Sequence, residues 1–116
     1  MIAKRPKRER KPTGAGAALK AQIAANAYCL RRYSVGFTGG KPRPLTLDFG
    51  KIWIVPVMLA SPGYGWVGDV GLVAVDASTF QVIGATPRPE VMAAGARLER
   101  ENRDALDAAF HRARKA

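Results

Sequence analysis

The run IWIVPVMLA, residues 52–60, leaves the chain few ways to fold. Successive side chains of a strand point to opposite faces, so this run is apolar on both. It is far shorter than the ~20 apolar residues of a membrane-spanning helix. It therefore predicts a central strand with something packed on each face, or with one face used in an interface. Pro56 cannot donate to a ladder and predicts a bulge, or the point where pairing on one side ends.

Further strands are predicted on both sides of this run. Leu45, Leu47 and Phe49 alternate with polar residues, which is typical of a half-buried strand. The apolar segments 69–77 and 81–85 are joined by a short polar turn and predict a hairpin. In that turn, Asp76 is expected to accept hydrogen bonds from the backbone N–H groups of Ser78 and Thr79, as in an Asx turn. We expect its role to be structural.

Helices are predicted before and after the β region. Residues 15–33 are rich in alanine, which favours helix and close packing on a flat surface such as a sheet. The larger residues at helical spacing are Leu19, Ile23, Ala27 and Leu30. Residues 91–115 carry a second apolar stripe. The predicted fold is α+β, an antiparallel sheet of three to four strands packed by an N-terminal helix and followed by a long C-terminal helix.

With 116 residues the chain is expected to form one domain. Its predicted parts are a basic arm over residues 1–13, an α-β-β-β-β core over 14–87 and a C-terminal amphipathic helix over 88–116. The basic residues of the arm are Lys4, Arg5, Lys7, Arg8, Arg10 and Lys11. Together with Glu9 they carry half of the net charge of +10. Such an arm attracts phosphate, anionic lipid or an acidic protein surface, unless it is only a solubilising tail.

A second set of basic residues follows the arm along the chain. They are Arg31, Arg32, Lys41 and Arg43. If the end of the first helix lies close to the glycine- and proline-rich loop of residues 36–44, this set extends the arm into one cationic face, for nucleic acid or an acidic partner. The aromatic residues that could then stack on unpaired bases are Tyr28, Tyr33, Phe37, Tyr64 and Trp66. Alternatively, these rings belong to the core.

A candidate protein interface is predicted at the glycine-rich segment SPGYGWVG, residues 61–68. We expect an exposed loop there, which carries Tyr64 and Trp66. Exposed tyrosine and tryptophan are favoured anchors at protein interfaces, and glycine lets a partner approach closely. The alternative is that Trp66 is buried beneath its own hairpin.

Few residues suited to catalysis stand together in the sequence. The chain has one histidine, His111, and one cysteine, Cys29, in different predicted helices, with no third residue evident to orient them. A metal-spaced His/Cys cluster and a phosphate-binding Gly-x-x-x-x-Gly-Lys-Ser/Thr motif are both absent from the sequence. We therefore expect a protein that is not an enzyme and has no cofactor and no metal.

The sequence predicts a cytoplasmic protein that does not associate with a membrane. A single cysteine cannot form an internal disulfide. The basic N-terminal segment is not followed by the continuous apolar stretch of a secretory signal. No apolar run approaches the length of a membrane span.

Two short motifs carry a family resemblance. W-x-V-P-V at residues 53–57 and V-x-V-D-A-x-T-x-x-V at residues 73–82 resemble the small PepSY-type modules of bacterial proteins, over roughly residues 19–85. In those modules a helix precedes a strand that begins with tryptophan, and a hairpin closes on a Val-Asp-Ala-x-Thr-Gly turn. This chain has Phe80 where the pattern has glycine, at a position that usually needs a positive φ. Either the turn takes another form, or Phe80 is held out for contact.

The resemblance implies a non-catalytic interaction or inhibitory unit, and free-standing proteins of this type look like partners of small toxin nucleases. It thus implies an antitoxin-like or regulatory role in a toxin–antitoxin system, with Tyr64, Trp66 and Phe80 as interface residues. The expected partners are a protein, with a nuclease toxin as one option, and nucleic acid bound by the arm. An RNA- or DNA-binding accessory subunit of a nucleoprotein or ribosome-associated complex is the alternative, and an inhibitor of peptidases is a third possibility. The oligomeric state stays open.

Overall fold

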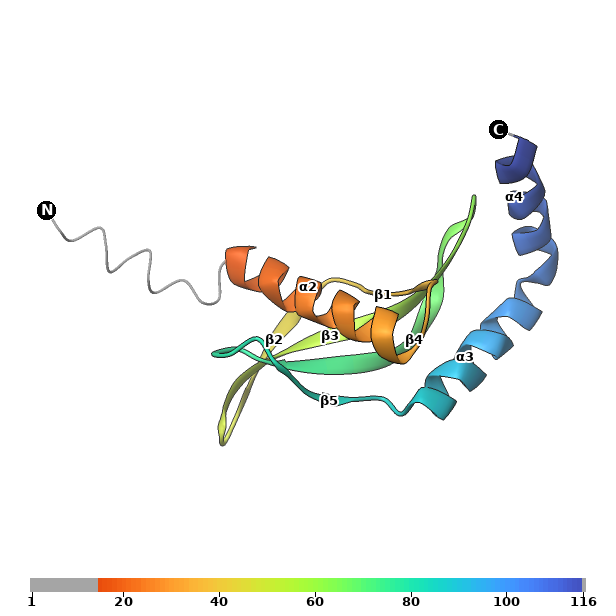
Figure 1. The fold of residues 1–116 in the computed structure, drawn as a ribbon. Coiled ribbons are helices and arrows are strands. Elements are labelled where there is room, and N and C mark those ends of the chain that lie inside the picture. The colour runs from red at the N-terminus through yellow and green to blue at the C-terminus, as the bar shows by residue number, and fades with distance from the viewer. Residues whose placement is uncertain (1–14, 116) are drawn as a thin grey trace, which may run out of the picture.

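The structure, a computed structural model, describes residues 15–115, and the side chains of residues 16–112. Helix α2 (Ala15–Arg32) precedes the sheet, and helices α3 (Arg88–Glu101) and α4 (Arg103–Lys115) follow it. The strands are β1 (Phe37–Gly39), β2 (Arg43–Leu47), β3 (Gly50–Ser61), β4 (Gly65–Asp76) and β5 (Val82–Ala85). Figure 1 shows the curled sheet, with α2 lying across it and the last two helices at one end. The predicted α+β class is confirmed.

The sheet has five strands within the described residues, more than predicted, and every pair is antiparallel. Two segments that we expected to be loops are partly strand. Residues 36–44 contain β1 and the start of β2, and β4 already begins at Gly65. The chain reverses within a short turn in which Gly63 and Gly65 adopt positive φ values of 76° and 92°. Pairing with β3 then holds this part of β4 extended, despite the low strand propensity of Gly65, Gly68 and Gly71.

Pro56 lies where the strand that pairs with one edge of β3 changes from β2 to β1. β2 pairs with β3 as far as Ile54, and β1 pairs with it from Val57 onward. The prediction that pairing on one side ends at Pro56 is therefore confirmed. Its carbonyl still accepts a hydrogen bond from the N–H of Gly40 at 2.8 Å.

Helix α2 packs on the sheet through its smallest side chains. The buried residues of the helix are Ala17, Ala21, Ala25 and Cys29, spaced four apart, and they cluster with the valines of β3 and β4. Small side chains let the helix approach closely, since a Cβ at Gly39 of β1 would lie 3.2 Å from the Cβ of Ala25. The expected close packing on a sheet is confirmed. The larger residues Leu19, Ile23 and Leu30 fall on the outer side of α2, where they are exposed.

The expected long C-terminal helix is two helices separated at Asn102. Asn102 has φ −116° and ψ 19°, and both its backbone N–H and its side-chain Nδ2 donate to the carbonyl of Leu98, at 3.0 and 2.9 Å. Helix α3 packs on the same face of the sheet as α2, because Val91 belongs to the same buried cluster. Within the described residues, no helix is both long and apolar enough to cross a bilayer.

Candidate interaction surface

One face of the central strands β3 and β4 carries apolar residues that no described helix covers. Trp53, Val55 and Val57 point toward α2 and are buried. The alternate side chains point the other way, away from α2 and α3, which pack on the first face. We call the second set the open face: it comprises Ile54, Pro56 and Met58 of β3, which are half-buried, and Leu72 of β4. Ile52, at the start of the same face, is buried. Leu72, opposite Pro56, is 48 % exposed.

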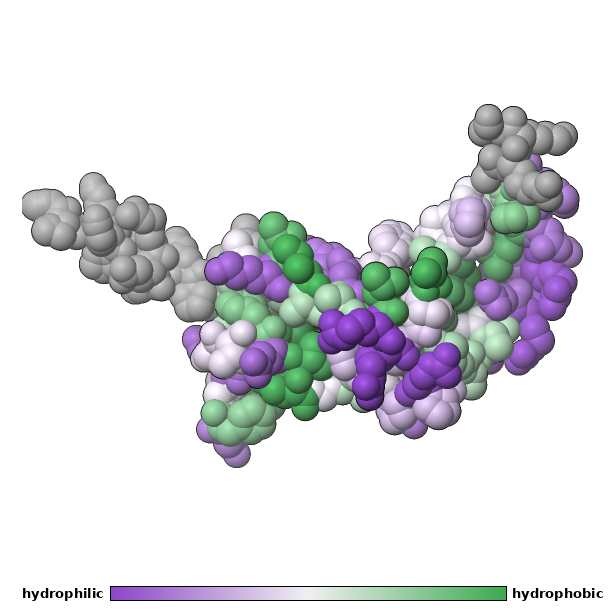
Figure 2. Space-filling view, viewed as in Figure 1, coloured by the Kyte–Doolittle hydropathy of each residue, from purple (hydrophilic) through white to green (hydrophobic). Residues whose placement is uncertain are grey.

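A groove of about 690 Å³ leads from α2, across the connection between β1 and β2, to the open face. We call it the Trp66 groove. Its lining residues are Ala18, Leu19, Gln22, Gly40, Lys41, Pro42, Met58 and Trp66. Leu19 and Trp66 are 56 % and 57 % exposed. Lys41 is the one charged side chain among these described lining residues. Figure 2 shows apolar side chains at the surface over α2, whereas hydrophilic ones dominate along α4.

Strand geometry determines how Trp66 is presented. It lies on β4 opposite Ala60, so the prediction that it sits on a loop is wrong. The alternative that the hairpin buries it is wrong as well, because it remains more than half exposed. Tyr64 lies in the turn and is exposed. Gly40 makes room for the groove, since a Cβ there would lie 2.9 Å from the Sδ of Met58. Sequence reasoning missed Leu19 and Met58, whose positions depend on tertiary packing.

Side chains of α2 cap the outer edge of β1. The Oδ1 of Asn26 accepts hydrogen bonds from the N–H of Gly39 at 2.6 Å and from the Oγ1 of Thr38 at 2.8 Å. The Nε2 of Gln22 donates to the carbonyl of Gly39 at 3.1 Å. Farther along the same edge, Pro44 has no N–H to offer. Capped groups and prolines protect an edge against the addition of another strand.

The structure does not bring the predicted basic residues into one face. Arg31 and Arg32 end α2, where the Nε of Arg88 donates to the carbonyl of Arg32 at 3.1 Å. Lys41 lines the Trp66 groove, and Arg43 is exposed on β2. Arg32 is thirteen residues beyond Leu19 on α2, which is about 20 Å along the helix axis. The six basic residues of the arm lie outside the described residues.

Several candidate aromatic residues belong to the core instead of a stacking surface. The ring of Tyr33 makes edge contacts with Tyr28 and Phe37, and its hydroxyl donates to the carbonyl of Thr86 at 2.7 Å. Burial is the main cause that raises the pKa of Tyr33 to about 12, so the hydroxyl keeps its proton. Phe80 is half-buried against the core, with the Nζ of Lys20 5.6 Å from its ring centroid. Tyr64 and Trp66 are therefore the exposed candidates.

The turn between β4 and β5 is held by Asp76 as predicted. Its Oδ1 accepts hydrogen bonds from the N–H of Ser78 at 2.7 Å and of Thr79 at 3.0 Å, which confirms the Asx turn. The bonds from the N–H groups of Thr79 and Ser78 stabilise the carboxylate and lower the pKa of Asp76 from its ordinary value. Phe80 follows with a φ of 59°. The turn thus keeps the positive φ of the glycine pattern although a phenylalanine stands there.

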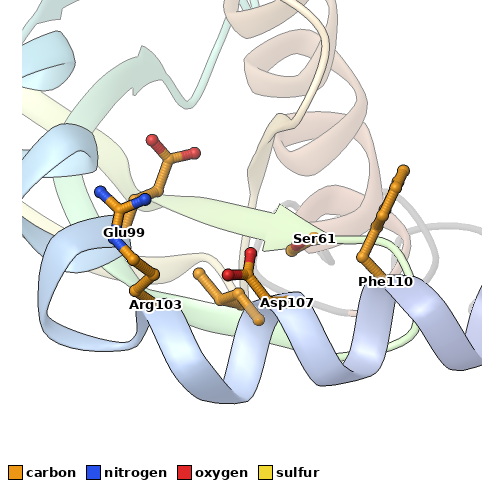
Figure 3. A pocket seen from close by; sticks show the side chains of 6 residues that line it. Ser61, Glu99, Arg103, Asp107 and Phe110 are labelled. Carbon is orange, nitrogen blue, oxygen red and sulfur yellow. The ribbon is translucent and has the colours of Figure 1, made fainter.

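A second, more polar hollow lies where the end of β3 meets the C-terminal helices. It has a volume of about 260 Å³. In Figure 3 the side chain of Asp107 projects from α4 toward the strand end at Ser61, and those of Glu99 and Arg103 lie farther from it along the helices. Five of its six described lining residues lie between Glu99 and Phe110, and folding adds Ser61 from the end of β3.

The two residues with the most reactive side chains do not form a pair. Cys29 is buried between α2 and the sheet, and burial raises the pKa of its thiol to about 11. His111 is exposed on α4. Among the described residues, no three His, Cys, Asp or Glu side chains are grouped in a way that could hold a metal ion.

No family model, no curated protein and no solved structure matches this chain. The PepSY-type resemblance therefore rests on the two motifs alone. The chain does have a helix before the strand of Trp53 and a hairpin around Asp76, with two short strands, β1 and β2, between the helix and that strand.

Proposed function

We propose that this chain is a non-catalytic interaction module that binds a protein partner in the cytoplasm, as an antitoxin-like or regulatory subunit of PepSY type. The observation that supports this most is the apolar surface outside the core. The open face and the outer side of α2 both carry large apolar side chains, and the Trp66 groove joins them. Large apolar patches are rare on monomers and usually mark interaction sites.

Charge supports an acidic partner. The chain has a net charge of +10, and long-range attraction speeds and strengthens association with a surface of opposite sign. The acidic substrate site of a nuclease toxin is one surface of this kind, because lysine and arginine side chains can replace the charge of its metal ion. Inhibition of the nuclease would follow from covering that site.

Affinity purification of the full-length chain from its native cell, with and without nuclease treatment, tests the proposal. We expect a protein partner that survives nuclease treatment and is lost when the chain carries Leu72→Ser on the open face. Phe49→Ser is the matched control, since Phe49 is exposed in the turn between β2 and β3. A partner that disappears with nuclease treatment, or that binds both Leu72→Ser and Trp66→Ala as well as wild type, would contradict the proposal.

Binding of RNA or DNA as an accessory subunit is the second candidate function, and the basic arm favours it. It predicts a log–log salt slope of about −0.7 to −0.9 for each phosphate contacted. Two observations weigh against it. Tyr33 and Phe37 pack in the core, and Arg31 and Arg32 lie far from Lys41. Binding that does not change with salt would eliminate this candidate.

A further inference from the structure

We infer that the Trp66 groove is the docking site for an acidic segment of a protein partner, which inserts a large apolar side chain between Trp66 and Leu19. This inference rests on the proposed function and adds the place of contact and the chemistry of the segment. It assigns Trp66, Leu19 and Met58 to the apolar contact and Lys41 to the contact with carboxylates.

The apolar part of the inference follows from the lining of the groove. Its volume of about 690 Å³ lies within the range of about 300–1,000 Å³ typical of ligand sites. Tryptophan is the residue most enriched among the side chains that dominate interface energies. Met58 adds a flexible thioether that adapts its shape to different inserted side chains.

The charge around the groove selects the occupant. Lys41 is the one charged residue among the lining residues that the structure describes, and the exposed Arg43 lies two residues along the chain. The exposed Asp69 of β4 pairs with Met58. The basic arm joins α2 at Ala15, three residues before Ala18 of the groove. The arm is itself strongly basic and a second copy carries +10, so repulsion disfavours both as occupants. A segment rich in Asp and Glu is attracted.

The capped edge specifies how the segment binds. Strand addition needs free backbone N–H and C=O groups, and Asn26 and Gln22 occupy those of Gly39. Pro42 and Pro44 remove donors from the adjoining stretch of the edge. The segment therefore binds through inserted side chains, in a helix or a loop, and not as an added strand.

Peptide display on the full-length chain tests the inference with a defined probe, random 12-residue peptides. We expect selected peptides to be enriched in Asp and Glu together with Leu, Phe or Trp. Their dissociation constants should rise by at least about tenfold with Trp66→Ala and with Leu19→Ser, and by about tenfold with Lys41→Glu. Phe49→Ser, at an exposed site outside the groove, should change them by less than about twofold. Far-UV circular dichroism verifies that each variant is folded.

Three outcomes would overturn the inference. The first is an absence of enrichment or the selection of neutral or basic peptides, and the second is binding that Trp66→Ala leaves unchanged. The third is displacement of the selected peptides by single-stranded RNA, which would assign the groove to nucleic acid. Capture of the native partner by the Leu72→Ser and Trp66→Ala variants distinguishes failure of this inference from failure of the proposed function. If Leu72→Ser abolishes capture of the partner and Trp66→Ala does not, the groove is wrongly assigned and the proposed function stands; if neither variant changes capture, both fail.

Discussion

In the turn between β4 and β5, the backbone conformation is unfavourable for Phe80, whereas the side chain of Asp76 stabilises the turn. Phe80 has a φ of 59°, in the left-handed region that costs a residue with a Cβ about 1–2 kcal/mol. Its ring packs partly on the core beneath Lys20, which offsets that strain. Asp76 is suited to its place by its own chemistry, because its carboxylate satisfies two backbone donors.

Substitutions at Phe80 separate the strain from the packing. Phe80→Gly and Phe80→Ala both remove the ring, but only alanine keeps a Cβ. We expect Phe80→Gly to be more stable than Phe80→Ala by about 1 kcal/mol, measured by urea unfolding. At Ser78, where φ is not positive, the order should reverse, with Ser78→Ala at least as stable as Ser78→Gly. An alanine variant at position 80 that equals the glycine variant would show that the backbone relaxes.

The lowered pKa of Asp76 predicts a pH dependence of stability. The folded state favours the charged form, so the contribution of Asp76 is fully present above its unfolded pKa of about 4 and is lost as the pH falls through the folded pKa. Asp76→Asn keeps an acceptor oxygen but does not titrate. We expect the free energies of unfolding of wild type and Asp76→Asn to differ by a constant between pH 5 and 7. Below about pH 4 the wild type should lose stability faster. Parallel curves down to pH 2.5 would contradict this.

At the scale of elements, α2 carries two stripes with the same helical spacing. Leu19, Ile23, Ala27 and Leu30 are the stripe that hydropathy makes visible in the sequence, yet the sheet receives the stripe of alanines and Cys29. Periodicity predicts the helix because it is local. It cannot choose between two stripes, since that choice depends on how closely the sheet lets the helix approach.

The buried alanines of α2 predict that stability depends on side-chain volume on the inner side of the helix. Ala25 is fully buried against Gly39, whereas Ala27 is exposed on the same helix. Ala25→Leu should destabilise the fold by about 1–3 kcal/mol or more through overpacking. Ala27→Leu, the same chemical change two residues later, should stay within about 0.5 kcal/mol of wild type. Thermal and urea unfolding measure both, and equal effects would mean that the helix does not pack as described.

The cap on β1 predicts local opening of the sheet edge. Asn26→Ala leaves the N–H of Gly39 without its acceptor and should cost about 1–3 kcal/mol. Hydrogen exchange of the Gly39 amide should accelerate together with that loss. Asn26→Asp keeps an Oδ1 acceptor and should retain most of the protection. Unchanged exchange in Asn26→Ala would show that another group protects the edge.

At the scale of the whole molecule, charge and shape have separate roles in binding. Removing residues 1–12 takes away half of the net charge and leaves the groove and the open face in place. We expect the truncated chain to associate with its partner more slowly at low salt and with a weaker salt dependence. The two forms should converge near 1 M salt, where the Debye length is about 3 Å. Stopped-flow or surface-plasmon measurements would decide this, and equal rates at low salt would remove the arm from the binding mechanism.

The sequence predicts the fold class and the arrangement of a helix, a sheet and a helical C-terminal region, because these follow from local patterns of hydropathy, glycine and proline. It does not predict that β4 begins at Gly65, because long-range pairing with β3 overrides local propensity there, and it does not predict that the last helix breaks at Asn102. Trp66 stands out in the sequence as an aromatic anchor. Its neighbours in the groove, Leu19 and Met58, come from different elements and only the folded chain brings them together.

The division of α2 into an inner and an outer side has a practical consequence for protein engineering. The inner alanines hold the helix in place, so positions 19, 23, 27 and 30 tolerate replacement without unfolding the chain. A library randomised at these positions would sample new recognition specificities on an unchanged scaffold. By the same reasoning, a natural lineage could exchange one partner for another through a few surface replacements.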